Sequence, residues 1–459
     1  MHRFDGMIAA GLSLNLCVQI ATSSVGANSS TAGTASAPAD VVLVVVDDLG
    51  WADASCMPDG RHETPAIDGL AEAGTLFTHA SANGPNCAPA RASLMTGLWP
   101  PNHGVLTVAP IKRGPASLRK MHLPPSALQL QPGQRTIATA LRDSGWHTVH
   151  IGKWHLGNDP TKHGFDVNIG GSNKGHPKSH FSPYLNPTLP DGPEGECLTD
   201  RLVDEAIAQL SEDRDEPVFL HLSFYDVHTP LQAHPDCLQE TKEEQSAWTL
   251  RQAKYDCMVR RTDAAIGRLL EHVKDDSLIL LCSDHGGVGR LAHSGQLRGC
   301  KGQLLEGGIR TPLIIAGPGI EAGRVCDTPM SLHDLVPTIA DWFGLEVVDN
   351  WDGHSLAPLL QGRSMGANAP AQYWHYPYYL GAAGAVAGQW RTTPVSAIRV
   401  GDWKLMEYLE DGSLALFDLH DDSGEQVNLA DQRPAIRDTM LLLLQAWRHR
   451  VDAPMPTPL

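Results

Sequence analysis

The feature that most constrains the fold is a run of six apolar residues, 41–46, which is followed directly by two aspartates. A run without polar alternation is typical of a strand that is buried on both faces of a sheet. Downstream, segments with helical periodicity alternate with further apolar runs. The helical segments are 135–144, 199–210 and 252–273, and the apolar runs are 146–151, 217–224, 278–282 and 311–316. This order predicts an α/β fold in which a large, mostly parallel sheet is sandwiched between helices.

Polar side chains follow four of the apolar runs, at the point where each predicted strand ends. They are Asp47 and Asp48, then Lys153 and His155, then His228, and finally Asp284 and His285. Ligands of open α/β sheets bind in the crevice outside the carboxyl ends of the strands. We therefore expect all of these side chains to line one crevice.

Three of these side chains are carboxylates, Asp47, Asp48 and Asp284, and like charges brought together raise one another's pKa unless a cation lies between them. A hard divalent ion with oxygen ligands resolves the conflict, and Ca²⁺ tolerates irregular geometry better than Mg²⁺ does. Two alternatives stay open. The aspartate pair could instead cap a helix or lie in a solvated turn. His285 is either a metal ligand or a residue that orients Asp284.

The pattern of predicted secondary structure changes at about residue 369. Short strands separated by turn signals are indicated at 396–400, 403–408 and 415–419, and a helix is indicated at 433–448. The pattern predicts a large α/β domain over residues 40–368 and a C-terminal α+β subdomain, a smaller antiparallel sheet plus a helix, over residues 369–459. Within the first domain, the stretch 158–196 is rich in Gly, Pro, Asn and His and is expected to be a long loop, of a kind that is often functional.

The N-terminus has the features of an export signal. A weakly basic start, an apolar stretch over residues 7–21 and small residues at 25–27 predict a signal peptide at 1–27, followed by a linker at 28–39. We expect a secreted or periplasmic protein without integral membrane association, because no run is long and apolar enough for a confident transmembrane helix. In an exported chain, Cys237 and Cys257 would either form a disulfide or remain two thiols.

Acidic residues outnumber basic ones in this chain. It has 52 Asp and Glu against 35 Lys and Arg, a formal net charge of −17. Such an excess argues against nucleic acid or an anionic membrane as a partner over a broad surface. It leaves room for a small anionic substrate, which needs only a local cationic pocket.

Four motifs carry a resemblance to a known family. Residues 86–97 read Asn-Cys-Ala-Pro-Ala-Arg-Ala-Ser-Leu-Met-Thr-Gly, so Cys87 lies four residues before Arg91. The other three are Gly-Lys-Trp-His-Leu-Gly around Lys153, Val-His-Thr-Pro around His228, and Lys-Gly-Gln-Leu-Leu-Glu-Gly-Gly-Ile-Arg-Thr-Pro from Lys301. On these motifs, the chain resembles the type I, formylglycine-dependent sulfatases of the alkaline phosphatase superfamily. Segments 397–405 and 428–430 also look like sulfatase tail segments. The alternative for Cys87 is a buried thiol at a loop-to-helix boundary, and Ala90 departs from the serine common at its position.

The resemblance implies a nucleophile and a metal. Cys87 would be oxidised to formylglycine by a separate maturation enzyme, and the hydrated aldehyde would attack the sulfur of a sulfate ester. Ca²⁺ would be bound by Asp47, Asp48, Cys87, Asp284 and His285. The catalytic sulfatase domain would then be the α/β domain, 40–368.

The resemblance also implies roles for the cationic residues. Lys153 and Lys301 would stabilise sulfate oxygens, and His228 with Lys301 would protonate the leaving alcohol. His155 would remove the proton of the second hydroxyl of the hydrated aldehyde, and Arg91 would hold the nucleophile in place. The substrate-binding residues among these would be Lys153, His228 and Lys301.

The implied activity is hydrolysis of sulfate esters, on a sulfated carbohydrate or an aryl sulfate. One alternative is a phosphodiester or phosphonate monoester hydrolase of the same superfamily, and another is a binder of sulfated glycans that keeps an unmodified Cys87. Candidate subsites are the basic pairs 112–113 and 119–120, the loop 170–180, and the aromatic cluster near Trp374. Each of these is otherwise explained as ordinary surface or packing.

Overall fold

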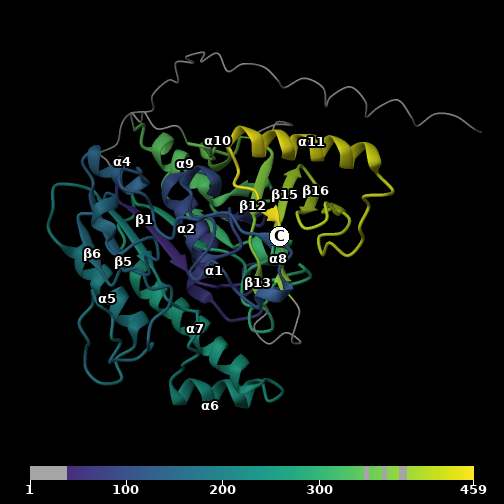
Figure 1. The fold of residues 1–459 in the computed structure, drawn as a ribbon. Helices are drawn as coiled ribbons and strands as arrows, with labels where there is room; N and C mark the ends of the chain where they lie inside the picture. The colour runs from purple at the N-terminus through teal and green to yellow at the C-terminus, as the bar shows by residue number, and fades with distance from the viewer. Residues whose placement is uncertain (1–38, 346–350, 364–369, 382–389) are drawn as a thin grey trace, which may run out of the picture. The chain divides into compact units, whose positions relative to one another are not determined.

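The centre of the fold is an eight-stranded sheet (Figure 1). The computed structural model describes residues 39–345, 351–363, 370–381 and 390–459, so the predicted signal peptide and residues 28–38 of the predicted linker lie outside the described residues. In spatial order the strands are β10 (Arg324–Cys326), β2 (Gly74–Phe77), β9 (Leu313–Ala316), β8 (Leu278–Ser283), β1 (Val41–Val46), β7 (Val218–Ser223), β5 (His147–Gly152) and β6 (Val167–Ile169). Strand β1 lies inside the sheet with all six side chains buried, as its unbroken apolar run predicts.

The sheet is mostly parallel, which confirms the predicted fold class. Strands β8 and β7 run parallel to β1 on its two sides, and β5 continues the parallel order. Strand β9 is the exception, because it pairs antiparallel with both β8 and β2. The predicted loop 158–196 contains the short strand β6 and the 3₁₀ turn η2 (Pro160–His163), and is otherwise without helices or ladder strands.

Helices cover both faces of the sheet, and the alternation of side chains along β1 shows why. Val42, Val44 and Val46 point into one apolar core and Val41, Leu43 and Val45 into the other. The first core is closed by α1 (Pro65–Ala73), α5 (Leu198–Ser211) and α7 (Leu250–Leu270), and the second by α2 (Cys87–Thr96), α4 (Ile137–Asp143) and α9 (Leu335–Trp342). The predicted helices are thus present, with boundaries shifted by a few residues.

Several short elements connect these layers. They are β3 (Ala80–Ser81), α3 (Pro100–His103), η1 (Ala116–Leu118), β4 (Met121–His122), α6 (Pro235–Glu244), α8 (Glu306–Ile309), β11 (Met330–Ser331), η3 (Leu332–Asp334), α10 (Ala357–Leu360), β13 (Leu380–Gly381), β14 (Trp390–Thr392) and β18 (Thr457–Pro458). Among the helices in the described part of the chain, none combines the length and the apolar character that crossing a bilayer requires.

The C-terminal sheet is antiparallel, as predicted. Its strands, in spatial order, are β12 (Gln372–Tyr376), β15 (Val395–Val400), β16 (Trp403–Tyr408) and β17 (Leu414–Asp418), and α11 (Pro434–Arg450) packs on them. Trp374 is fully buried and donates its indole N–H to the carbonyl of Ala82 at 2.7 Å. Tyr376 and Tyr378 are buried in the same core. The aromatic cluster therefore packs the small sheet against the large domain and does not line a subsite.

A buried cluster of charges also joins the C-terminal sheet to α8. The Nζ atom of Lys404 lies 2.8 Å from an oxygen of Glu306 and 2.9 Å from an oxygen of Glu425. Glu306 accepts a further hydrogen bond from Arg310 at 2.8 Å, and Arg399 lies 3.7 Å from it. Buried charges persist only when they compensate one another. Four of these five residues belong to the motif segments that begin at residues 301 and 397. These motif residues therefore have a structural role, because they hold the C-terminal sheet against the large domain.

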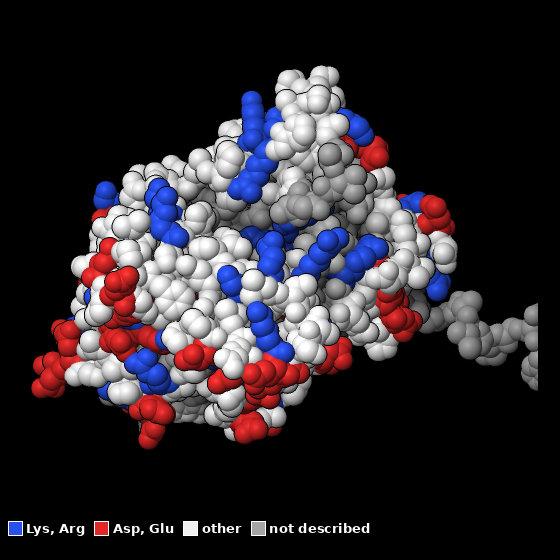
Figure 2. Space-filling model, turned by 90° about the horizontal axis from the view of Figure 1, so that it is seen from below, with Lys and Arg blue, Asp and Glu red and all other residues white. Residues whose placement is uncertain are grey.

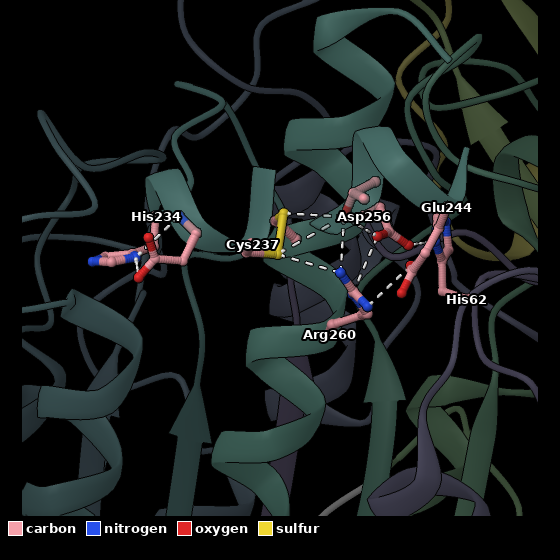
Figure 3. Close-up of a disulfide and its surroundings, with 9 residues drawn as sticks. His62, His234, Cys237, Glu244, Asp256 and Arg260 are labelled. Carbon is pink, nitrogen blue, oxygen red and sulfur yellow. Dashed lines mark hydrogen bonds and ion pairs between the residues drawn. A yellow bond between two sulfur atoms is a disulfide. The ribbon is translucent and has the colours of Figure 1, made fainter. Parts of the chain in front are cut away.

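A disulfide joins α6 to α7 (Figure 3). Cys237 and Cys257 are bonded, and their Cα atoms are 5.9 Å apart. This decides between the two states that the sequence left open. Beside the disulfide, a guanidinium nitrogen of Arg260 in α7 lies 3.5 Å from a carboxylate oxygen of Glu244 in α6, so the α6–α7 pair is held by covalent and ionic links together.

Candidate active site

The strand-end side chains meet at one place, as predicted. Nε2 of His285, which follows β8, lies 3.4 Å from Oδ1 of Asp48, which follows β1. The ammonium group of Lys153, after β5, forms a salt bridge with Asp47. Nε2 of His228, beyond β7, lies 3.7 Å from Oδ2 of Asp48. The carboxyl ends of four neighbouring strands therefore form a single site, and the aspartate pair faces its interior instead of a solvated turn.

Cys87 enters this site as the first residue of α2. Its Sγ lies 3.7 Å from Oδ1 of Asp47 and 3.2 Å from Nε2 of His285. Burial by itself raises the pKa of the Cys87 thiol, but Lys153, Lys301 and His285 outweigh burial and lower it well below its ordinary value. The N-terminal end of a helix favours negative charge as well. The fold thus holds this sulfur in a setting that stabilises an anion.

Four potential ligand atoms cluster here. One atom from each of Asp47, Asp48, Cys87 and His285 lies within 4.8 Å of the others, and all four residues are buried. The Nδ1–H of His285 donates to the carbonyl of Gly286 at 2.9 Å, which turns Nε2 toward the cluster. Oδ2 of Asp48 is buried without a hydrogen-bond partner. An orphaned carboxylate oxygen beside an inward-facing imidazole nitrogen is an arrangement that a bound cation would satisfy.

The electrostatics of the cluster point the same way. Burial raises the pKa of Asp47 well above its usual range; Lys153 opposes this, while Asp284, Cys87 and Asp48 add to it. Carboxylates that raise one another's pKa ionise together when a divalent cation is added. The residues present therefore fit a hard metal ion such as Ca²⁺. The Cys87 sulfur stands where formylglycine would present an oxygen, the donor that Ca²⁺ prefers.

Asp284 lies at the edge of the cluster. Its Oδ1 accepts the backbone N–H of Asp48 at 3.3 Å, and its Oδ2 accepts Nε–H of Arg91 at 2.8 Å. Burial raises the pKa of Asp284, but His285 and Arg91 overcome this and lower it below its usual range. Its Oδ1 is 3.5 Å from Nε2 of His285. The structure thus places four of the five predicted ligands in one cluster and the fifth directly beside it.

Arg91 and Lys301 anchor the surroundings of the cluster. Arg91 donates to the carbonyl of Lys153 at 3.0 Å and to Oγ of Ser223 at 2.5 Å. Lys301 donates to Oδ1 of Asp48 at 2.6 Å. Burial lowers the pKa of Lys301, but Asp48 outweighs burial and the net pKa is raised, so its ammonium stays charged. Ser223 was missed in the sequence, although it is the last residue of β7 and therefore stands at a strand end like the others.

The two remaining histidines lie on loops beside the cluster. Burial lowers the pKa of His155 despite its hydrogen bond to Cys87, and burial likewise lowers that of His228, to about 4. The Nδ1–H of His228 donates to the carbonyl of Thr229 at 2.8 Å, which leaves Nε2 facing Asp48. His180, a further residue missed in the sequence, donates from Nε2 to the carbonyl of His228 at 3.0 Å. Both predicted proton carriers therefore border the same site.

Basic side chains gather around a hollow on one face of the molecule (Figure 2). Figure 2, seen from below, shows Lys and Arg side chains around a hollow, with Asp and Glu side chains toward the margin. A cavity of about 380 Å³ lies beside His228 and is lined by His176, Pro177, Lys178, Thr229 and Pro230. In the predicted basic pairs, the guanidinium groups of Arg113 and Arg119 donate to backbone carbonyls of their own segment. Lys112 and Lys120 are exposed.

Comparisons with known proteins agree with this geometry. A family model described as Sulfatase matches residues 39–345, and a second, described as N-sulphoglucosamine sulphohydrolase, C-terminal, matches residues 300–448. Human N-acetylgalactosamine-6-sulfatase is 30% identical over 72% of this chain and 67% of its own length. A sulfatase of Formosa agariphila is 26% identical over 99% of this chain and 95% of its own. The crystal structure of Ps i-CgsB in complex with k-i-k-neocarrahexaose superposes with a TM-score of 0.74 at 26% identity, covering 89% of this chain and 92% of that one.

Proposed function

This chain belongs to the sulfatase family and is a sulfuric ester hydrolase, and from that premise we propose that it removes sulfate from a sulfated carbohydrate, with Cys87 converted to formylglycine as its nucleophile and Ca²⁺ as its metal. The carbohydrate class is supported by the relative named for N-acetylgalactosamine and by the similar structure that holds a neocarrahexaose. The observation that carries the site is the cluster of Asp47, Asp48, Cys87 and His285 within 4.8 Å.

Ca²⁺ would be held by these four residues with Asp284 beside them; when bound, it would draw charge from the attacking oxygen that formylglycine supplies. The remaining steps belong to the side chains of this chain. Lys153 and Lys301, both paired with cluster carboxylates, stabilise the sulfate oxygens as negative charge develops on them. Arg91 holds Asp284 and, through Lys153, the start of the loop after β5.

Proton transfer falls to the two bordering histidines. His228 is neutral in the free site, and the negative charge of a bound sulfate ester favours its protonation. With Lys301 beside it, His228 delivers a proton to the leaving alcohol. His155, which hydrogen-bonds Cys87, would remove the proton of the second hydroxyl of the hydrated aldehyde, so that the carbon–oxygen bond to sulfate breaks, sulfate leaves and the aldehyde forms again.

Export is part of the proposal. The signal-like N-terminus supports a secreted or periplasmic location, and the Cys237–Cys257 disulfide suits an oxidising compartment. A formylglycine-generating maturation enzyme would be a necessary partner, because the gene encodes only the cysteine.

The test is a substitution at Cys87 in protein that is coexpressed with a maturation enzyme. We expect Cys87→Ala to reduce sulfate release to background, whereas Cys56→Ala, at a free cysteine away from the cluster, leaves it unchanged. The mass of the peptide that carries Cys87 reports conversion directly. Sulfate release that survives in Cys87→Ala would refute the proposed nucleophile. A panel of phosphodiesters and phosphonate monoesters covers the alternative: faster turnover of these than of any sulfate ester would replace the proposed substrate class.

A further inference from the structure

One short segment, residues 172–178, touches both histidines at the site. The backbone N–H of His155 donates to the carbonyl of Ser172 at 2.9 Å. Gly175 packs against the imidazole of His155 so closely that a Cβ placed on it would lie 2.6 Å from Cε1. The ring of His176 stacks on that of His228, with 5.9 Å between centroids and an interplanar angle of 5°. The segment therefore spans from one proposed proton carrier to the other.

The same segment forms one wall of the 380 Å³ cavity, and the residues that follow His228 form the other. This cavity is open to solvent on one side, and its volume lies within the range of sites for small organic ligands, so one face of a sugar ring can rest in it. The half-buried ring of Pro230 offers an apolar surface over the buried Pro177, and the exposed ammonium group of Lys178 offers a positive charge. An apolar wall with one cation suits a carbohydrate that carries an acidic group.

The cavity lies on the side of the site where the carbohydrate part of the substrate is expected. In the proposed function, His228 stands at the leaving alcohol, and in a sulfated carbohydrate that alcohol is the carbohydrate itself. The cavity adjoins His228 through Thr229 and His176. Because the whole chain carries a net charge of −17, an anionic saccharide needs local positive charge to bind here.

We propose that this cavity is a specificity subsite for the sugar that bears or adjoins the sulfated position, and that Lys178 binds a second acidic group on that sugar, a carboxylate or another sulfate. The proposal rests on the proposed function and adds the substrate class: saccharides with more than one anionic group. Lys178 is exposed, so its attraction is screened by salt and acts on substrate binding more than on the chemical step.

The experiment compares Lys178→Gln with wild type on four substrates: a small aryl sulfate, a disaccharide with a single sulfate and no other charge, the same disaccharide with a uronic carboxylate, and the same disaccharide with a second sulfate. We expect Lys178→Gln to raise KM about five- to tenfold for a doubly charged substrate, with kcat retained and the aryl and singly charged substrates unaffected. Lys178→Arg should restore KM. Lys162→Gln, the same change at an exposed lysine outside the cavity, should leave it as in wild type.

The possible outcomes distinguish a failure of the proposed subsite from a failure of the proposed sulfatase function. A rise in KM with only the carboxylate or only the second sulfate supports the subsite and identifies its acidic group. Unchanged KM for both doubly charged substrates overturns the subsite while leaving the sulfatase activity intact. An equal rise for the aryl sulfate also overturns it, because the lysine would then act on the sulfate site as a whole. If wild type hydrolyses none of the four sulfate esters, the proposed function itself fails.

Discussion

The substitution Gly175→Ala probes the packing of one histidine with a single added methyl group. The Cβ of the alanine would lie 2.6, 2.8 and 3.0 Å from three atoms of the His155 ring, whereas ordinary contacts begin at 3.4 Å. Relief of the shortest contact therefore requires a shift of about 0.8 Å between the ring and the segment. Gly175 has no left-handed backbone conformation, so the clash is the whole perturbation.

Displacement of a proton-transfer group by about 1 Å costs about 100-fold in rate. We expect kcat of Gly175→Ala to fall roughly 30- to 100-fold, which corresponds to about 2–3 kcal/mol of activation free energy. Steady-state rates on a small aryl sulfate give this value without involving the neighbouring sugar cavity. The fraction of Cys87 converted to formylglycine is measured in each preparation, so that a loss of maturation is not mistaken for a loss of catalysis.

Gly69→Ala is the matched control. Gly69 lies in α1 with nothing within 4 Å of an added Cβ, so this change should leave kcat unaltered and stabilise the helix by about 0.5–1 kcal/mol. A kcat of Gly175→Ala within twofold of the wild-type value would refute the reasoning. Either catalysis would tolerate the displacement of the His155 ring, or His155 would take no part in proton transfer. A raised KM with unchanged kcat would refute it too, by showing that the segment yields and the ring does not.

Three further predictions concern stability. Burial lowers the pKa of His62, but hydrogen bonds to Asp256 and Asp53 outweigh burial and raise the pKa to about 9. About 3 kcal/mol of stability is therefore present below pH 6.5 and is lost as the pH rises to 9. The unfolding temperatures of wild type and His62→Gln should converge over that pH window, and a constant gap between them would contradict this. Replacing Cys237 and Cys257 by serine opens a cross-link between residues 20 apart and should lower the free energy of unfolding by about 3 kcal/mol, measured by urea titration; an unchanged midpoint would count against it. Removal of divalent ions with a chelator should lower Tm and Ca²⁺ should restore it, whereas an unchanged Tm would argue against a metal at the strand-end cluster.

Much of the site follows from strand order alone. A parallel strand delivers the residue after its last apolar position to the same edge as its neighbours, so Asp47, Lys153 and Asp284 had to approach one another once the sheet was recognised. Antiparallel pairing of β9 did not follow, because a strand buried on both faces has the same apolar pattern in either direction. The buried cluster around Glu306 did not follow either, because its partners come from segments about a hundred residues apart.

Local chemistry along the chain is enough to set the sheet, the strand-end polar set and the cysteine motif, since periodicity and spacing act over a few residues. Contacts between distant loops needed the tertiary structure. It alone directs both oxygens of Asp284 to Asp48 and Arg91, brings Nε2 of His285 to the sulfur of Cys87, and lays Gly175 on the ring of His155. The physical reason is that a side chain's partner depends on the path of a loop 20 to 240 residues away, and no local pattern encodes that path.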